Sequence, residues 1–487
     1  MGRTSIAIVA GWMLAWVAVT APAQVTPDTP DIPAHFEFPA SMFDYSVREE
    51  MIPMRDGTRL YTAIVIPKGA DHAPMVLTRT PYNAHDIALG KSERLLRDTL
   101  PLADDVFVAS GYIRVYQDVR GKYRSEGDYF MAPPLSGTIN SVKVDDSTDA
   151  WDTIDWLVHH VSESNGRVGM TGYSYAGFTT ALALINPHPA LKVAAPENPQ
   201  IDGWMGDDWF HYGAYRNVNL SYYTEQTATR ALGPNIPMAA FDDYTAFLQA
   251  GSSGDFAKAA GLEQLPFWQK IITHPAYDDF WSKQAVDRIL AGQPLKVPTM
   301  WVQGSWDHVD MWGAVHAYAA VEAKDHGNDM NYLVMGPWQH GQQNFTGFSL
   351  GVFHWAGDTS LQFRRDMLLP FFNQYLLEGA PKAKLSPVTV YNAGSNHWEH
   401  MDRWPPACEQ GCAVKSKPLY LHSGGRIDFE PPLATEAASD TYLSDPAHPV
   451  PNRPRPFGAA APDAWGSWSV IDQRFVDDRP DVISYVS

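Results

Sequence analysis

The chain has 487 residues, of which 45% are hydrophobic, so it can bury a large core and form more than one domain. This composition excludes a disordered or fibrous protein. Lysine and arginine total 36 against 55 aspartate and glutamate residues, a formal net charge of −19 that would repel a phosphate backbone. We therefore expect no nucleic-acid partner.

A short apolar segment follows a basic residue at the N-terminus. Arg3 precedes an apolar run from Ile6 to Val19, and small residues follow at Ala21-Pro22-Ala23. This order predicts a signal peptide over residues 1–23. A transmembrane anchor is the less favoured alternative, because the run is shorter than a bilayer span. We expect an exported protein, periplasmic or secreted, with no stable membrane span after cleavage.

Buried strands alternate with helical patterns through most of the chain. Apolar, β-rich runs predict strands at 75–78, 112–116, 167–171, 298–304 and 332–336. Before the third strand, Ser147 is the expected N-cap of a helix that runs through Trp151, Ile154 and Leu157. The alternation predicts an α/β fold with a mostly parallel sheet covered by helices on both faces.

The pattern changes in two later stretches. Residues 215–295, including 241–250, show helices separated by glycine and proline and predict a helical cap inserted into the sheet domain. From about Val388, short strands such as 419–421 lie between turn residues and predict a second, all-β domain. The expected division is a signal peptide at 1–23, the sheet domain at 40–213 and 296–380, the cap at 214–295 and the β-domain at 385–487.

A serine lies where a buried strand turns into a helix. The strand at 167–171 continues into Gly172-Tyr173-Ser174-Tyr175-Ala176-Gly177, and a helix of small residues follows. Such a sharp turn lifts a serine clear of the sheet, as a nucleophile elbow requires. Ala176 occupies the place of the second glycine in Gly-x-Ser-x-Gly, so an ordinary turn is the alternative. We predict that Ser174 is a nucleophile.

An aspartate and a histidine follow two later strands, in the chain order Ser, Asp, His known for α/β-hydrolases. Asp307 follows the strand at 298–304 and His340 follows the strand at 332–336, so both should project from the sheet edge that presents Ser174. We predict that His340 is the general base and that Asp307 orients it. The alternatives are a helix-capping aspartate and a histidine without a catalytic role. This chemistry needs no metal and no other cofactor.

The oxyanion formed in such a reaction needs two hydrogen-bond donors. The backbone N–H of Tyr175, the residue after the nucleophile, is one donor by geometry. The loop after an early strand contains Thr80-Pro81-Tyr82 instead of a glycine-rich turn, so the Tyr82 hydroxyl is the second expected donor. A packed aromatic side chain is the alternative interpretation of Tyr82.

The chain has two cysteines, Cys408 and Cys412. An oxidising compartment would let them pair. Two sulfur atoms without a nearby histidine make a poor zinc site, so we expect a local disulfide.

Six short motifs occur in one order along the chain: 52–57, 80–82, 118–121, 172–177, 304–307 and 336–340. In these motifs the chain resembles the cocaine esterase-like and X-Pro dipeptidyl peptidase group of hydrolases, and within it the α-amino acid ester hydrolases and glutaryl-cephalosporin acylases. The resemblance implies an α/β-hydrolase domain with a helical cap and a C-terminal jelly roll. It also implies the triad Ser174, Asp307 and His340, with Tyr82 and the Tyr175 amide as the oxyanion hole.

Amino ester hydrolases of this group hold the substrate ammonium with a cluster of carboxylates. Asp208 and Asp310 occupy positions that resemble this cluster, and such carboxylates would select a protonated α-amine through charge-assisted hydrogen bonds. The chain departs from the family pattern at Val309, where an acid is usual. Ordinary helix-cap carboxylates are the alternative for both aspartates.

The terminal β-domain of the family normally continues well beyond the segment that resembles 476–480, whereas this chain ends at Ser487. We therefore expect an incomplete jelly roll with an unpaired edge.

The sequence thus predicts an exported serine hydrolase or acyl transferase that forms an acyl-enzyme with a small-molecule acyl substrate, an α-amino acid ester or a β-lactam side-chain amide. An X-Pro dipeptidyl peptidase and a non-catalytic binding protein are the alternatives. A homo-oligomer is left open.

Overall fold

The computed structural model describes residues 26–33, 35–408, 411–458, 466 and 468–487. The predicted signal peptide at 1–23 therefore lies outside the described residues. Met1–Met42 and Phe43–Ser487 are separate units, and the first holds the short 3-10 helix η1 (Ala40–Met42). Among the described residues, no helix is long and apolar enough to cross a membrane.

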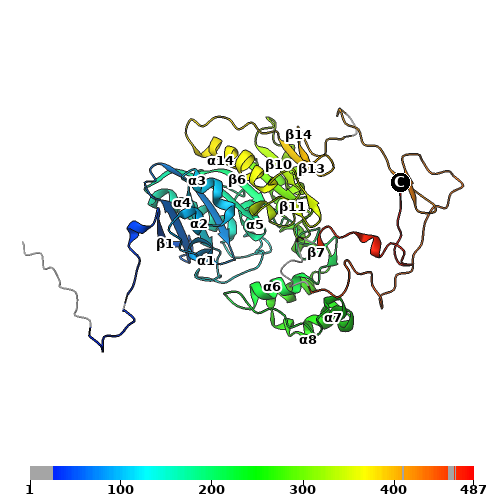
Figure 1. The fold of residues 1–487 in the computed structure, drawn as a ribbon, viewed down its shortest axis with the longest axis horizontal. Coiled ribbons are helices and arrows are strands. Elements are labelled where there is room, and N and C mark those ends of the chain that lie inside the picture. Colours follow the sequence, from blue (N-terminus) through cyan, green and yellow to red (C-terminus); the bar gives the residue numbers. More distant parts are fainter. Residues whose placement is uncertain (1–25, 34, 409–410, 459–465, 467) are drawn as a thin grey trace, which may run out of the picture. The chain divides into compact units, whose positions relative to one another are not determined.

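A ten-stranded sheet forms the centre of the second unit (Figure 1). Its spatial order is β1-β2-β4-β3-β5-β6-β9-β10-β13-β14. The strands from β4 to β13 pair in parallel, whereas β1, β2 and β14 pair antiparallel at the two edges. The bounds are β1 (Tyr45–Pro53), β2 (Arg59–Pro67), β3 (Ala73–Thr80), β4 (Ile113–Asp118), β5 (Ser164–Tyr173), β6 (Leu191–Glu197), β9 (Thr299–Gly304), β10 (Asn331–Gly336), β13 (Val388–Asn392) and β14 (His397–Met401).

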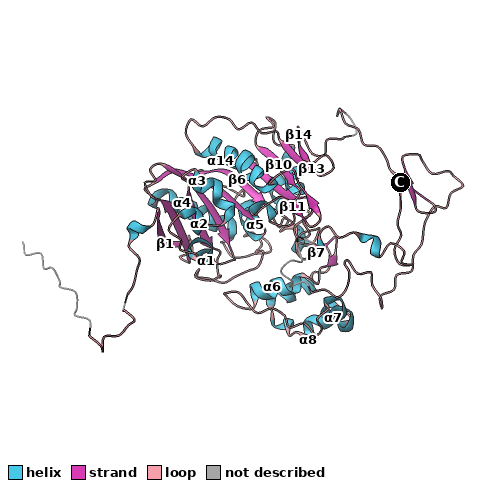
Figure 2. Cartoon of the chain, viewed as in Figure 1, coloured by secondary structure: helices cyan, strands magenta, loops and turns pink. Residues whose placement is uncertain are grey.

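The strands inside this sheet are buried because helices flank it (Figure 2). Every residue of β3, β4, β9 and β10 is buried, as expected for parallel strands covered on both faces. The helices around the sheet are α1 (Ala84–Leu89), α2 (Leu96–Thr99), η2 (Leu102–Asp104), α3 (Asp105–Ala109), α4 (Asp146–His160), α5 (Tyr175–Leu182), α12 (Gly313–Glu322), η4 (Gln342–Asn344), α13 (Thr359–Phe363), the π-helix η5 (Arg364–Leu368) and α14 (Leu369–Leu376). The fold is that of an α/β-hydrolase.

The N-cap of helix α4 lies two residues before the N-cap predicted from the sequence. Asp145, and not Ser147, is its N-cap: the Asp145 carboxylate accepts from the backbone N–H of Ser147 and Thr148, and the Thr148 side chain accepts from the Asp145 N–H. This capping box satisfies donors that a helix start leaves unpaired. Ile154 and Leu157 lie on the buried face of α4.

The stretch between β6 and β9 is mainly helical, as the sequence predicts. Its aromatic core joins Trp209, Tyr223, Phe267 and Trp268 through ring contacts. The elements are β7 (Phe210–His211), β8 (Ala214–Tyr215), α6 (Asn219–Thr227), α7 (Asp243–Ala250), α8 (Ser253–Ala259), η3 (Leu262–Gln264), α9 (Pro266–Thr273), α10 (Asp279–Ser282) and α11 (Val286–Ala291).

The segment assigned to a β-domain from residue 385 begins differently from the prediction. Its first two strands, β13 and β14, extend the main sheet, because β13 pairs in parallel with β10. Farther along, the described residues form the hairpin of β15 (Tyr420–His422) and β16 (Arg426–Asp428) and the 3-10 helix η6 (Gln473–Phe475). A further small hairpin, β11 (Ser349–Leu350) with β12 (Phe353–His354), precedes α13. The C-terminal jelly roll, which we expect to be incomplete, stays a prediction.

Candidate active site

Ser174 lies at a strained turn between β5 and α5. Its backbone has φ 59° and ψ −127°, a conformation that costs energy for a residue with a side chain and that occurs at functional turns. Small neighbours allow this turn: a Cβ on Gly172 would lie 2.6 Å from the Ala176 Cβ, and one on Gly177 would lie 2.5 Å from the Glu197 carbonyl oxygen. The second glycine that this elbow requires is therefore Gly177, and Ala176 is accommodated.

Asp307 and His340 come together at the same edge of the sheet. His340 Nδ1 lies 2.9 Å from Asp307 Oδ2 and 3.1 Å from Oδ1. Both side chains are buried. Because Nδ1 faces the carboxylate, Nε2 is the ring nitrogen that can act as a base.

The Asp307 carboxylate is surrounded by donors. Its Oδ1 accepts from the backbone N–H of Val309 at 2.7 Å and of Asp310 at 3.1 Å, and its Oδ2 accepts from Asn198 Nδ2 at 2.6 Å. Burial opposes ionisation of Asp307, but the His340 imidazole and the Val309 N–H outweigh it and hold the pKa below its usual value. The carboxylate is therefore charged and fixed in orientation.

Tyr82 follows β3 and is held by a tyrosine of the helical stretch. The Tyr82 and Tyr222 hydroxyls lie 2.8 Å apart. Tyr222 and the Ser174 side chain both act to lower the pKa of Tyr82. Burial raises the pKa of Tyr82 above its usual value, so the phenol keeps its proton. Tyr175 is the first residue of α5, where backbone N–H groups lack partners within the helix. Two donors thus lie beside Ser174.

Replacing Tyr222 with phenylalanine is expected to lower kcat about five-fold while leaving KM within two-fold. The change removes the hydroxyl that orients Tyr82, and a neutral hydrogen bond contributes about 1 kcal/mol. Steady-state kinetics on a methyl ester would measure this. Tyr212→Phe, at an exposed tyrosine, is the matched control, and equal kinetics of the two variants would contradict a role for Tyr222.

Asp208 and Asp310 form a buried acidic cluster beside this site. Both Asp310 carboxylate oxygens are buried and have no hydrogen-bond partner among the described residues, and Asp310 is 0% exposed. Burial, followed by the negative charges of Asp208 and its neighbours, raises the pKa of Asp310 well above its usual value. Burial likewise raises the pKa of Asp208, and the nearby Arg216 and His340 oppose that shift. The positive charge of Arg216 also acts against the shift in the pKa of Asp310, but in the described part of the chain no side chain donates a hydrogen bond to the Asp310 carboxylate.

Two residues that the sequence analysis did not single out hold the acidic cluster in place. Asp207 accepts four backbone N–H bonds, from Ile201 and Asp202 on one oxygen and from Trp312 and Gly313 on the other. Arg216 donates to the backbone carbonyls of Asp208, His308 and Val309. These bonds join the loop before β7 to the loop after β9. The Arg216 guanidinium thus donates to backbone carbonyls and acts on the Asp208 and Asp310 carboxylates through its charge.

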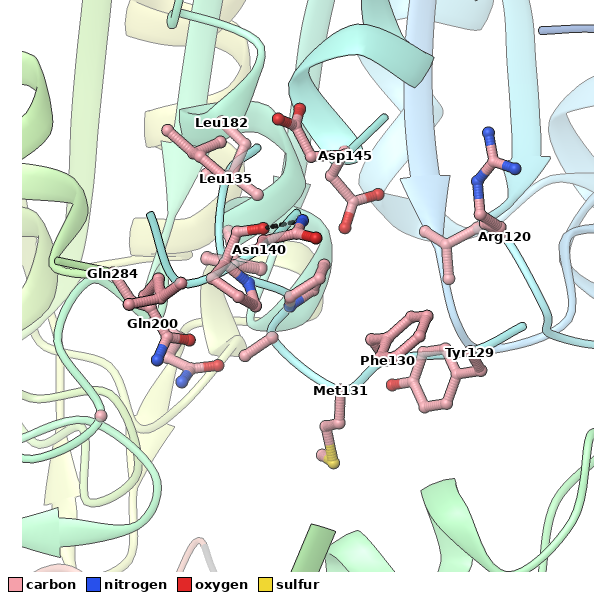
Figure 3. A pocket seen from close by; sticks show the side chains of 18 of the residues that line it. Arg120, Tyr129, Phe130, Met131, Leu135, Asn140, Asp145, Leu182, Gln200 and Gln284 are labelled. Atoms are coloured by element: carbon pink, nitrogen blue, oxygen red, sulfur yellow. Dashed lines mark hydrogen bonds between the residues drawn. The ribbon is translucent and has the colours of Figure 1, made fainter. Parts of the chain in front are cut away.

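A cavity of about 450 Å³ is lined in part by Tyr175 and Trp209. Figure 3 shows Tyr129, Phe130 and Met131 along one side of it and Gln200 with Gln284 on the opposite side. Ser174, Asp307 and His340 are not among its lining residues. Tyr175, which follows Ser174, is the residue that this cavity and the candidate site have in common.

Cys408 and Cys412 are joined by a disulfide. Within the part of the chain that the structure describes, no group of three or more His, Cys, Asp or Glu side chains is arranged to hold a metal ion.

The chain is similar to a known protein family and to several individual hydrolases. The model of the X-Pro dipeptidyl-peptidase (S15) family matches residues 56–342. Cocaine esterase from Rhodococcus sp. (strain MB1 Bresler) is 29% identical over 469 residues, which cover 91% of this chain and 74% of the esterase.

Two solved structures are more similar. A selenomethionine-labelled α-amino acid ester hydrolase is 59% identical with a TM-score of 0.92, over 95% of this chain and 75% of that chain. An aminopeptidase from a marine sediment archaeon, Thaumarchaeota archaeon, is 45% identical with a TM-score of 0.88, over 94% of this chain and 74% of that chain. The chain thus spans about three-quarters of each protein.

Proposed function

Because the chain belongs to the X-Pro dipeptidyl-peptidase (S15) family, we propose that it hydrolyses small α-amino acid esters, or transfers their acyl group, through an acyl-enzyme on Ser174. It is an ester hydrolase of the serine, α/β-hydrolase type. Our proposal concerns the selectivity for α-amino acyl groups and the catalytic roles of the individual residues. The similarity to the amino acid ester hydrolase and the geometry around Ser174 support them.

In the proposed mechanism Ser174 attacks the ester carbonyl while His340 Nε2 takes the serine proton and then gives it to the leaving alcohol. Asp307 holds the imidazole through Nδ1 and stabilises its positive charge. The Tyr82 hydroxyl and the Tyr175 N–H donate to the tetrahedral oxyanion. Water, activated by the same histidine, then releases the acid.

The proposed selectivity rests on the Asp310 carboxylate, whose two oxygens are buried without a hydrogen-bond partner among the described residues. A buried carboxylate without a donor is costly, and a substrate ammonium would supply both donors and charge. The Asp208 and Asp310 carboxyls interact electrostatically with each other, and Asp208 also interacts with His340. An α-ammonium held by both would lie beside the acyl carbonyl of a short substrate.

Asp310→Asn is expected to lower the preference for an α-amino ester by about 10- to 100-fold, because one charge-assisted hydrogen bond is lost. The preference is the ratio of kcat/KM for phenylglycine methyl ester to that for methyl phenylacetate, which lacks the amine. A ratio of rates is independent of the active fraction, so partial unfolding of the variant would not imitate this result.

The matched control for this experiment is Asp104→Asn. Asp104 is also buried, but it lies outside the acidic cluster and its carboxylate already accepts from Arg114 and Tyr116, so this variant should lower Tm and leave the ratio unchanged. An unchanged ratio in Asp310→Asn would exclude the ammonium site and leave a general serine esterase.

The similarity to an aminopeptidase favours a second candidate function, cleavage of the amide bond after an N-terminal residue. A cluster that holds an α-ammonium would serve both reactions, because the acyl halves of the two substrates are alike. Phenylglycine amide compared with phenylglycine methyl ester separates the candidates. A kcat/KM for the amide at or above that for the ester would replace the esterase proposal with the peptidase.

We also propose that the protein is exported. The charged, apolar and small-residue order of residues 1–23 and the disulfide between Cys408 and Cys412 support this. N-terminal sequencing of protein recovered from a periplasmic fraction should begin at Gln24, and intact Met1 in the cytoplasm would contradict export.

A further inference from the structure

A buried series of amides connects Asp307 to a second carboxylate. Asn198 Nδ2 donates to Asp307 Oδ2 at 2.6 Å. Gln343 Nε2 donates to Asn198 Oδ1 at 2.5 Å and to Glu197 Oε2 at 3.0 Å. Asn198 and Gln343 are 0% exposed, Glu197 is 2% exposed and Asp307 is 5% exposed. Water therefore has little access to this series of hydrogen bonds.

The carboxylates at its two ends fix the direction of every hydrogen bond. A carboxylate only accepts, so the Gln343 amide must present its NH₂ group to Glu197. The same nitrogen then donates to Asn198 Oδ1, which leaves Asn198 Nδ2 facing Asp307. This orientation leaves Gln343 Oε1 buried without a hydrogen-bond partner among the described residues, a cost that a purely packing role would not require.

The same residues join the segments that carry the three catalytic side chains. The Glu197 carbonyl accepts from the Ser174 N–H at 3.0 Å. Gln343 belongs to η4, which begins two residues after His340. Asn198 has φ 41°, in the left-handed region that asparagine tolerates better than most residues. Both the backbone and the side chain of Asn198 thus suit this position.

We propose that Asn198 is a positioning residue whose amide, oriented through Gln343 by Glu197, holds the Asp307 carboxylate for His340. This inference rests on the proposed catalytic role of Asp307. The amide shares the negative charge on Oδ2. Without it, the carboxylate becomes a stronger acceptor for the imidazolium. The acidic limb of the pH–rate profile then moves to higher pH.

Asn198→Gly tests this most cleanly, because glycine removes the amide and adopts φ 41° without strain. We expect kcat to fall roughly ten-fold, with KM within two-fold. The midpoint of the acidic limb of kcat/KM should move up by roughly 0.5 unit, the scale of one lost hydrogen bond. Methyl phenylacetate is the substrate, since it carries no amine to titrate, and fluorophosphonate titration counts the active sites.

Three further variants separate positioning from packing. Asn198→Asp places a negative charge beside Asp307 and should move the midpoint farther upward. Gln343→Leu removes the group that orients Asn198 and should move it in the same direction by less. Asn344→Ala is the matched control: Asn344 Nδ2 donates to Glu197 Oε2 at 2.8 Å but lies off the path to Asp307, so the midpoint should not move.

A loss of kcat in Asn198→Gly without a shift of the midpoint would overturn the inference, because a merely structural defect lowers the rate at every pH. An equal shift in Asn344→Ala would overturn it as well. Asp307→Asn distinguishes this failure from failure of the proposed function: if that variant loses activity while Asn198→Gly behaves as wild type, only the positioning role is wrong.

Discussion

Ser174→Ala is expected to lower kcat/KM for phenylglycine methyl ester by about 10⁴-fold or more, with the fold intact. The variant removes the only atom that forms the acyl bond in the proposed mechanism. Alanine and serine both have a Cβ, so the backbone strain at this turn is the same in the variant and the wild type. The Ser174 side chain makes no capping hydrogen bond to α5 that the variant could lose. Tm should therefore change little.

The measurement combines initial rates with covalent labelling by a fluorophosphonate, which should be lost in the same variant. Ser305→Ala is the matched control, since Ser305 is an exposed serine directly after β9 and should retain wild-type rates. Turnover within ten-fold of wild type in Ser174→Ala would exclude this serine as the nucleophile.

Asp307→Asn is expected to lower kcat by about 10⁴-fold, the scale known for this change in a serine triad. The backbone N–H groups of Val309 and Asp310 donate to Oδ1, so the carboxamide oxygen of the variant would settle there. Its NH₂ group would then face His340 Nδ1, which forces the proton onto Nε2. Such a tautomer cannot accept the serine proton.

The structural consequence of Asp307→Asn can be measured separately from catalysis. The new NH₂ group would also face the Asn198 amide nitrogen, which donates to Oδ2 in the wild type, so Tm should fall. Asp366→Asn, at an exposed aspartate that pairs with Arg365, is the control. A kcat loss below ten-fold in Asp307→Asn would remove this residue from the triad.

The parallel core of the fold could be predicted from sequence because its strands are continuous apolar runs. The runs at 75–78 and 332–336 lie within β3 and β10, whose residues are all buried. The edge strand β1 was not predicted, because its burial pattern mixes exposed and half-buried residues. Likewise, the residue pattern after Val388 could not show that β13 pairs with β10, because that pairing depends on residues far away in the sequence.

From the sequence, only those residues of the candidate site could be predicted that directly follow a strand and keep the order Ser, Asp, His. Ser174, Asp307 and His340 each follow a strand, and parallel strands end at a common edge. Asn198 also follows a strand, β6, but an asparagine there has many ordinary interpretations. Tyr222 comes from the helical stretch, and its contact with Tyr82 spans 140 positions. Such pairings follow from tertiary packing and leave no local signal.

One competition experiment tests whether Ser174 is a nucleophile that selects α-amino acyl groups. The protein is mixed with equal concentrations of phenylglycine methyl ester and methyl phenylacetate, quenched rapidly in acid, and analysed by intact mass and peptide mapping. We expect a phenylglycyl adduct on the peptide that contains Ser174, in large excess over the phenylacetyl adduct. Equal amounts of the two adducts would contradict the selectivity, and acylation at another residue would contradict the nucleophile.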